Sequence, residues 1–135
     1  TNLELLRRST LAHELGHIRL HSEEISQGVT LHYFGGSGQF TDSRSYQKER
    51  EADLYAGIFL VPVEDLLAQR TVRNLLRNKE NQRQMSTRTL WKMVYLLASQ
   101  FKVSPSLMKR CLQELGWLEQ GEPMKSGLRE LRIRF

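Results

Sequence analysis

Cysteine and long apolar stretches are scarce in this chain. Its single cysteine, Cys111, excludes an internal disulfide and is typical of a reducing compartment. The sequence contains no run of about 18 consecutive apolar residues, so it predicts no membrane-spanning helix. No signal-peptide pattern opens the chain. We therefore expect a cytoplasmic protein that does not act at a membrane.

Length and charge narrow the class of protein further. A chain of 135 residues with 39% hydrophobic residues predicts one compact globular domain, with at most a small appendage. The formal net charge is +5, and basic residues such as Lys109 and Arg110 concentrate after Pro62. This distribution is compatible with a surface that binds nucleic acid, a solvated surface that keeps the protein soluble, or a surface that binds an acidic protein. Because the basic residues form no tight cluster and few aromatics lie among them, direct DNA binding is the less favoured prediction.

An H-E-x-x-H pattern at residues 13–17 lies inside a stretch with helical periodicity. His13 and His17 are four residues apart, so on a helix both imidazoles can reach one metal ion. Glu14 lies about 100° further around the helix than His13, near the open side of such a metal. The pattern therefore favours metal-assisted hydrolysis, with zinc as the Lewis acid and Glu14 as the general base. The alternative is an ordinary amphipathic helix that carries two surface histidines.

A catalytic zinc site usually takes three protein ligands, so a third one is needed. His21 continues the four-residue spacing, but it would lie about 12 Å from His13 along the helix axis. We expect His21 beside the site and not among the ligands, and His32, in a probable strand or loop, is unconstrained. The best candidate is Glu49, in a second predicted helix over residues 45–61.

The face of the second helix that carries Glu49 supports this assignment. Asp53 lies one turn further along the same face, where it can orient a ligand histidine from behind. Two alanines on this face allow another helix to come close, and Gly16 between the two motif histidines matches them. The alternative is that the charged residues 48–51 form only a solvated face.

Other side chains near these motifs could contact the substrate or stabilise an oxyanion. The candidates are His21, His32, Tyr46 and Tyr55, and nothing in their spacing selects one of them. A rival class of function is a regulatory module that keeps a metal but binds DNA or a protein without turnover. That rival predicts salt-sensitive DNA affinity that depends on basic residues, and no effect of Glu14→Gln.

The motifs resemble those of the ImmA/IrrE metallopeptidases. The resemblance rests on H-E-L-G-H at 13–17, E-R-E-A-D at 49–53 and F-L-V-P at 59–62, and it continues more weakly at residues 96–104. It implies an intracellular zinc endopeptidase whose substrate is a helix-turn-helix repressor or antitoxin. It also implies that His13, His17 and Glu49 bind zinc and that Glu14 is the base. Asp53 stands where this family commonly has asparagine.

These patterns predict a mostly α, small α+β fold that is zincin-like, with a C-terminal helical part. We predict a metallopeptidase core over residues 1–78, a helical hairpin or helix-turn-helix-like part over 85–118, and a linker with a C-terminal tail over 119–135. Helices are expected at 2–21, 45–61, 63–78, 86–101 and 104–115, the last two capped by Ser86, Ser104 and Gly116. Short strands are expected at 29–34 and 128–135, and residues 119–126 are expected to form the linker.

Overall fold

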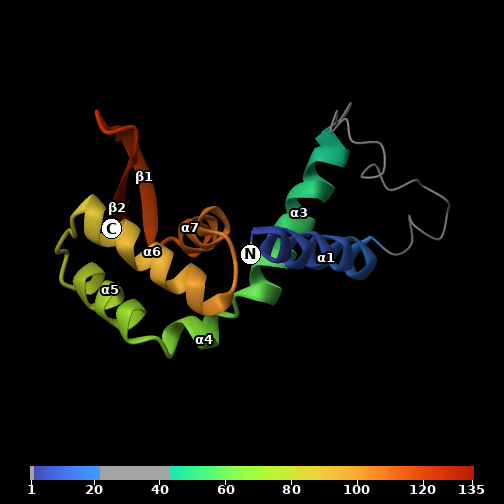
Figure 1. The fold of residues 1–135 in the computed structure, drawn as a ribbon, viewed down its shortest axis with the longest axis horizontal. Helices are drawn as coiled ribbons and strands as arrows, with labels where there is room; N and C mark the ends of the chain where they lie inside the picture. Colours follow the sequence, from blue (N-terminus) through green and yellow to red (C-terminus); the bar gives the residue numbers. More distant parts are fainter. Residues whose placement is uncertain (1, 22–42) are drawn as a thin grey trace.

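The computed structural model describes residues 2–21 and 43–135, and these residues form six helices and two strands (Figure 1). The helices are α1 (Asn2–Leu20), α3 (Ser43–Leu60), α4 (Val63–Leu67), α5 (Arg70–Glu80), α6 (Thr87–Phe101) and α7 (Pro105–Glu114). The strands are β1 (Leu118–Pro123) and β2 (Arg129–Ile133), which pair as a two-stranded antiparallel sheet. The fold is therefore mostly helical with a small sheet, as predicted. None of the described helices is long and apolar enough to cross a membrane.

Helices α1 and α3 cross one another closely, to one side of the other elements in Figure 1. The crossing is made of small residues, because Ala12, Gly16, Ala52 and Ala56 are all buried. A Cβ atom added to Gly16 would lie 3.1 Å from both the Ala52 carbonyl oxygen and the Tyr55 Cβ. The predicted reason for a glycine between the two motif histidines is thus confirmed: the backbone of α3 passes directly over it.

The main apolar core lies among α4 to α7 and the β-hairpin. Its largest fully buried side chains include Leu66, Leu75, Leu90, Leu97, Met108, Leu112, Leu131 and Ile133. Helix α3 joins this core through Leu60, its last residue, through Val61, which directly follows it, and through its contacts with α7. At the other side, the Arg8 side chain of α1 donates a hydrogen bond of 3.0 Å to the Phe101 carbonyl oxygen. The α1–α3 pair is therefore held against the core at two places.

The predicted caps of the last two helices are confirmed. The Ser86 hydroxyl accepts a hydrogen bond from the Thr89 backbone N–H at 3.2 Å, and the Ser104 hydroxyl accepts one from the Leu107 N–H at 3.1 Å. Each bond satisfies an N–H that the first helical turn leaves without a partner. After α7, Gly116 has φ of +78°, the left-handed conformation that commonly ends a helix.

Two expected elements were wrong. The helix predicted over 63–78 is two helices, because Gln69 has φ −79° and ψ 131° and its extended backbone separates α4 from α5. Residues 119–126 do not form a linker, because Leu118–Pro123 is strand β1 and pairs with the expected strand near the C-terminus. After buried Leu118, the residues of strand β1 are largely exposed and mostly polar. The sequence of β1 therefore lacks the alternation of apolar and polar residues that predicts a strand. The strand expected at 29–34 lies outside the described residues, and the division of the chain into domains stays a prediction.

Candidate metal centre

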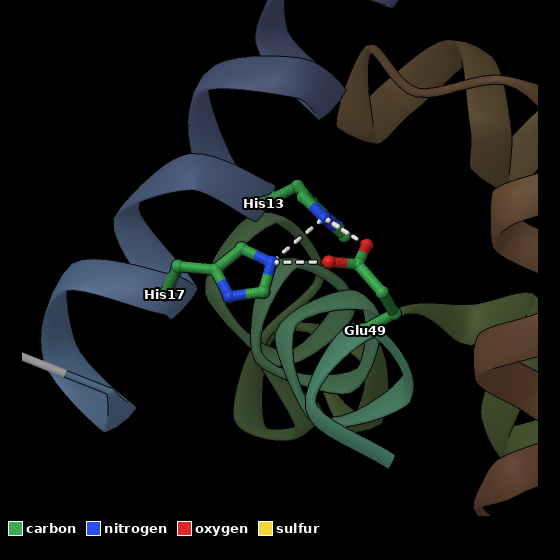
Figure 2. A group of neighbouring side chains, drawn as sticks. All are labelled: His13, His17 and Glu49. Atoms are coloured by element: carbon green, nitrogen blue, oxygen red, sulfur yellow. Dashed lines mark hydrogen bonds and ion pairs between the residues drawn. The ribbon is translucent and has the colours of Figure 1, made fainter. Parts of the chain in front are cut away.

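The two helices of the crossing bring His13, His17 and Glu49 together (Figure 2). His13 and His17 project from consecutive turns of α1, and Glu49 reaches toward them from α3. The Nε2 atoms of the two histidines are 3.2 Å apart. One Glu49 oxygen lies 3.0 Å from His13 Nε2 and the other lies 3.0 Å from His17 Nε2. The side chains of His13, His17 and Glu49 are only 15%, 5% and 17% exposed, so protein shields most of the site.

The chemistry and spacing of these atoms fit a tetrahedrally coordinated metal ion. Ligands at about 2.0–2.1 Å from a tetrahedral zinc lie about 3.3 Å from one another. The three donor atoms have nearest separations of 3.0 and 3.2 Å, and all of them lie within 4.8 Å of one another. Two imidazole nitrogens and one carboxylate are also a donor set that leaves a fourth position for water or substrate. Over residues 2–21 and 43–135, this is the one group of three such side chains close enough to share an ion.

Asp53 lies directly behind His13. Its Oδ1 accepts a hydrogen bond from His13 Nδ1 at 2.7 Å, which leaves His13 Nε2 facing Glu49. The Asp53 hydrogen bond outweighs burial and raises the pKa of His13, and the same bond lowers the pKa of Asp53. Arg110 of α7 lies beyond Asp53, with Nη1 3.6 Å from Asp53 Oδ2. Asp53 thus stands where the sequence placed it, and a helix from the distant C-terminal half supports it.

Glu14 is half-buried on the same helix, between the two histidine turns. Burial raises the pKa of its carboxyl group, and the Glu49 carboxylate raises that pKa further, whereas His13 opposes both effects. A carboxylate whose pKa moves toward neutrality is a better general base at physiological pH. The electrostatics of Glu14 therefore suit the role that the motif predicts for it.

The remaining candidates lie in different surroundings. Tyr46 is exposed and lines a surface cavity of about 360 Å³ beside Glu49 and Asp53. Tyr55 is half-buried under α1, where its ring stacks on that of Phe59 at 6.2 Å between centroids. Their roles toward the substrate stay predictions.

His21 lies behind the second motif histidine. Both of its ring nitrogens face protein groups, one at His17 and the other at Glu51. His32 lies outside the described residues. Sequence reasoning missed Glu51 as the partner of His21, because a charged residue beside Lys48 and Arg50 carries no signal that separates a carboxylate paired with another side chain from one that is only solvated.

The helix pair thus brings together three donors that fit a metal ion, with the Glu14 carboxyl group on the same helix as the two histidines. Comparison with protein families gives the particular class. The Peptidase_M78 family, described as the IrrE N-terminal-like domain, matches residues 4–112, which include most of α1, all of α3 to α6 and most of α7. The chain therefore belongs to this metallopeptidase family, as its motifs predicted. No curated protein and no solved structure matches the chain.

Proposed function

We propose that this protein is a zinc-dependent cytoplasmic endopeptidase. The observation that supports the proposal most strongly is the convergence of His13 Nε2, His17 Nε2 and the Glu49 carboxylate beside half-buried Glu14. A site of this composition, in a chain of a metallopeptidase family, is suited to the hydrolysis of a peptide bond.

The three donors would hold the zinc ion between α1 and α3. When bound, zinc supplies a Lewis acid that polarises the peptide carbonyl and lowers the pKa of water. Glu14 accepts a proton from the attacking water and returns it to the nitrogen of the leaving amine. The raised pKa of the Glu14 carboxyl makes the first of these transfers easier, because a carboxylate of higher pKa is a stronger base toward the water proton. Asp53 holds the His13 ring so that its Nε2 atom stays turned toward Glu49.

The proposed substrate is a helix-turn-helix repressor or antitoxin, as the resemblance to the ImmA/IrrE peptidases implies. The cavity beside Glu49 and Asp53 offers an approach from solvent for a segment of such a protein. Two of its lining residues, Tyr46 and Arg110, are exposed side chains that could donate hydrogen bonds to a bound peptide.

The test is to incubate the zinc-loaded protein with the repressor or antitoxin encoded beside it and to follow cleavage by mass spectrometry. Glu14→Gln is the decisive variant, because it removes the base and leaves all three proposed ligands. We expect cleavage by the wild type, none by Glu14→Gln, and equal zinc content in both. Glu80→Gln, which changes an exposed carboxylate at the end of α5, is the matched control and should cleave normally. Equal cleavage by Glu14→Gln and the wild type would refute the assigned role of Glu14.

One observation favours a second candidate, a metal-containing module that binds DNA without turnover. Arg70, Arg73 and Arg77 are exposed along one side of α5, beside a surface cavity of about 530 Å³. Arginines that follow one helix face in this way can contact successive phosphates of a nucleic acid. This candidate predicts DNA affinity that falls steeply with salt, falls again in Arg73→Ala, and is unchanged in Glu14→Gln.

A further inference from the structure

A second chain of polar contacts runs from the candidate metal centre to the surface, and it starts at His17, whereas Asp53 contacts His13. His17 Nδ1 lies 3.1 Å from Nδ1 of His21, the residue that directly follows the end of α1. His21 Nε2 lies 2.9 Å from Oε2 of Glu51 on α3. The His21 side chain is only 9% exposed, whereas that of Glu51 is 42% exposed. A nearly buried histidine therefore connects a candidate ligand to a carboxylate at the surface.

The partners determine where the protons lie along this chain. An ionised carboxylate only accepts hydrogen bonds, so His21 Nε2 must donate to Glu51. A neutral His21 then has an unprotonated Nδ1, which can only accept, so the proton between the two rings belongs to His17 Nδ1. A neutral His17 with a proton on Nδ1 has its lone pair on Nε2, the atom that faces Glu49 and His13. This is the tautomer that a metal ligand at Nε2 requires.

We propose that His21 and Glu51 are positioning residues that hold His17 in its metal-binding tautomer and orientation. The inference rests on the proposed metal site and adds to it a function for a histidine that is not itself a ligand. The two ligand histidines are then supported in different ways. His13 is held directly by the Asp53 carboxylate, whereas His17 is held by a neutral ring that a carboxylate in turn orients.

The position of the chain in the fold fits this role. His17 lies on α1, His21 directly follows the last residue of α1, and Glu51 lies on α3, so the contact forms only when the two helices are in the register that also brings Glu49 to the ligands. Exposed ion pairs contribute little to stability. Stabilisation of the surface therefore does not explain why the Glu51 carboxylate contacts a nearly buried histidine that in turn contacts His17. Gln47 also donates to Glu51, at 3.2 Å, but on the other carboxylate oxygen and from an exposed position. Gln47 thus provides a matched contact that does not lead to the metal centre.

The test measures zinc affinity by competition with a chelator, on the full chain stripped of metal. His21→Phe keeps an aromatic ring and removes the acceptor for His17, and Glu51→Ala removes the acceptor for His21. We expect each variant to bind zinc about 10-fold to 100-fold more weakly than the wild type, the usual effect of losing a partner of a ligand histidine. Glu51→Gln keeps a carbonyl oxygen for His21 and should recover most of the affinity. Gln47→Ala should bind zinc as the wild type does.

A double variant shows whether Glu51 acts on zinc binding through His21 or independently of it. If Glu51 acts through His21, then combining His21→Phe with Glu51→Ala should weaken zinc binding no more than His21→Phe alone. Additive losses would overturn the proposed order of contacts. Thermal unfolding of each variant without metal shows whether a change in affinity reflects a change in folding instead.

Nitrogen NMR of the wild type provides a readout that needs no variant. Long-range ¹H–¹⁵N spectra of the zinc-loaded protein should show His17 protonated at Nδ1 and His21 protonated at Nε2. The opposite pattern at His21 would overturn the inference. Tight zinc binding that neither His21→Phe nor Glu51→Ala changes would also overturn it while leaving the proposed peptidase intact. Failure of the wild type to bind zinc would refute both.

Discussion

Gly16 is the position where the packing of the two site helices can be tested most directly. In Gly16→Ala, the new Cβ would lie 3.1 Å from the Ala52 carbonyl oxygen, 3.2 Å from Ala52 Cα and 3.1 Å from Tyr55 Cβ. Carbon atoms in good contact are about 3.5–4.0 Å apart, so α1 and α3 must separate by a few tenths of an ångström. Alanine gains about 1 kcal/mol of helix propensity, whereas overpacking costs about 1–3 kcal/mol. The net loss of stability is therefore only about 0–2 kcal/mol.

The effect on the metal centre should be larger than the effect on stability. His13 and His17 lie on α1 and Glu49 lies on α3, so a separation of the helices moves the donors apart. A metal site tolerates changes of only about 0.2 Å in its metal–ligand distances, and the separation of α1 and α3 that the new Cβ requires is of similar size. We expect the zinc dissociation constant of Gly16→Ala to rise about 10-fold or more, measured by chelator competition, while the protein remains folded in a urea titration.

Gly57→Ala is the matched control for this prediction. Its new Cβ would meet Cys111 Sγ at 3.1 Å, on the side of α3 that faces α7, and so would not press on α1. This variant carries the same substitution at a contact of the same length, but the new Cβ meets one side-chain sulfur and not the backbone of the other site helix, so it should bind zinc with wild-type affinity. Wild-type affinity in Gly16→Ala would show that the helix spacing does not control the donor geometry.

Two predictions concern pH. Because the Asp53 hydrogen bond raises the pKa of His13, metal-free His13 stays protonated to a higher pH than an ordinary histidine, and zinc must displace that proton. Zinc affinity should therefore rise about tenfold per pH unit between about pH 6 and the raised pKa, then level off; a flat profile in calorimetry would contradict this. Burial raises the pKa of Cys111 to about 11, so alkylation of the folded protein near about pH 8 should be slow and should accelerate with pH. Rapid labelling of Cys111 at neutral pH without denaturant would be inconsistent with its burial.

Much of the candidate site could be predicted because it depends on short-range helical geometry. The four-residue spacing of His13 and His17 puts both on one face of any α-helix, whatever lies around it. The same periodicity puts Asp53 one turn after Glu49, and Gly16 indicated that another backbone comes close. These predictions need only the rotation of about 100° and the rise of about 1.5 Å per residue of an α-helix. The caps at Ser86 and Ser104 were equally local, because a serine hydroxyl satisfies an N–H only a few residues away.

The parts that sequence reasoning missed depend on contacts between distant segments. Strand β1 has little apolar alternation, and it is a strand because β2 pairs with it and Leu118 is buried against the core. The break at Gln69 lies between α4 and α5, which both contribute buried residues to that core, whereas the helical pattern of the sequence continued across it.

By itself, the sequence determined which side chains lie together on one helix: the two histidines with Glu14 between them on the first helix, and the pair of acids on the second. The small residues also predicted that these two faces meet, whereas only the tertiary structure decided the register between the helices and the segments that pack behind them. The register of α1 against α3 selects Glu51 as the partner of His21, and the docking of α7 brings Arg110 to Asp53 from 57 positions away. Helical periodicity is a property of the local backbone, whereas register and docking follow from burying the small residues of the crossing and the apolar core together.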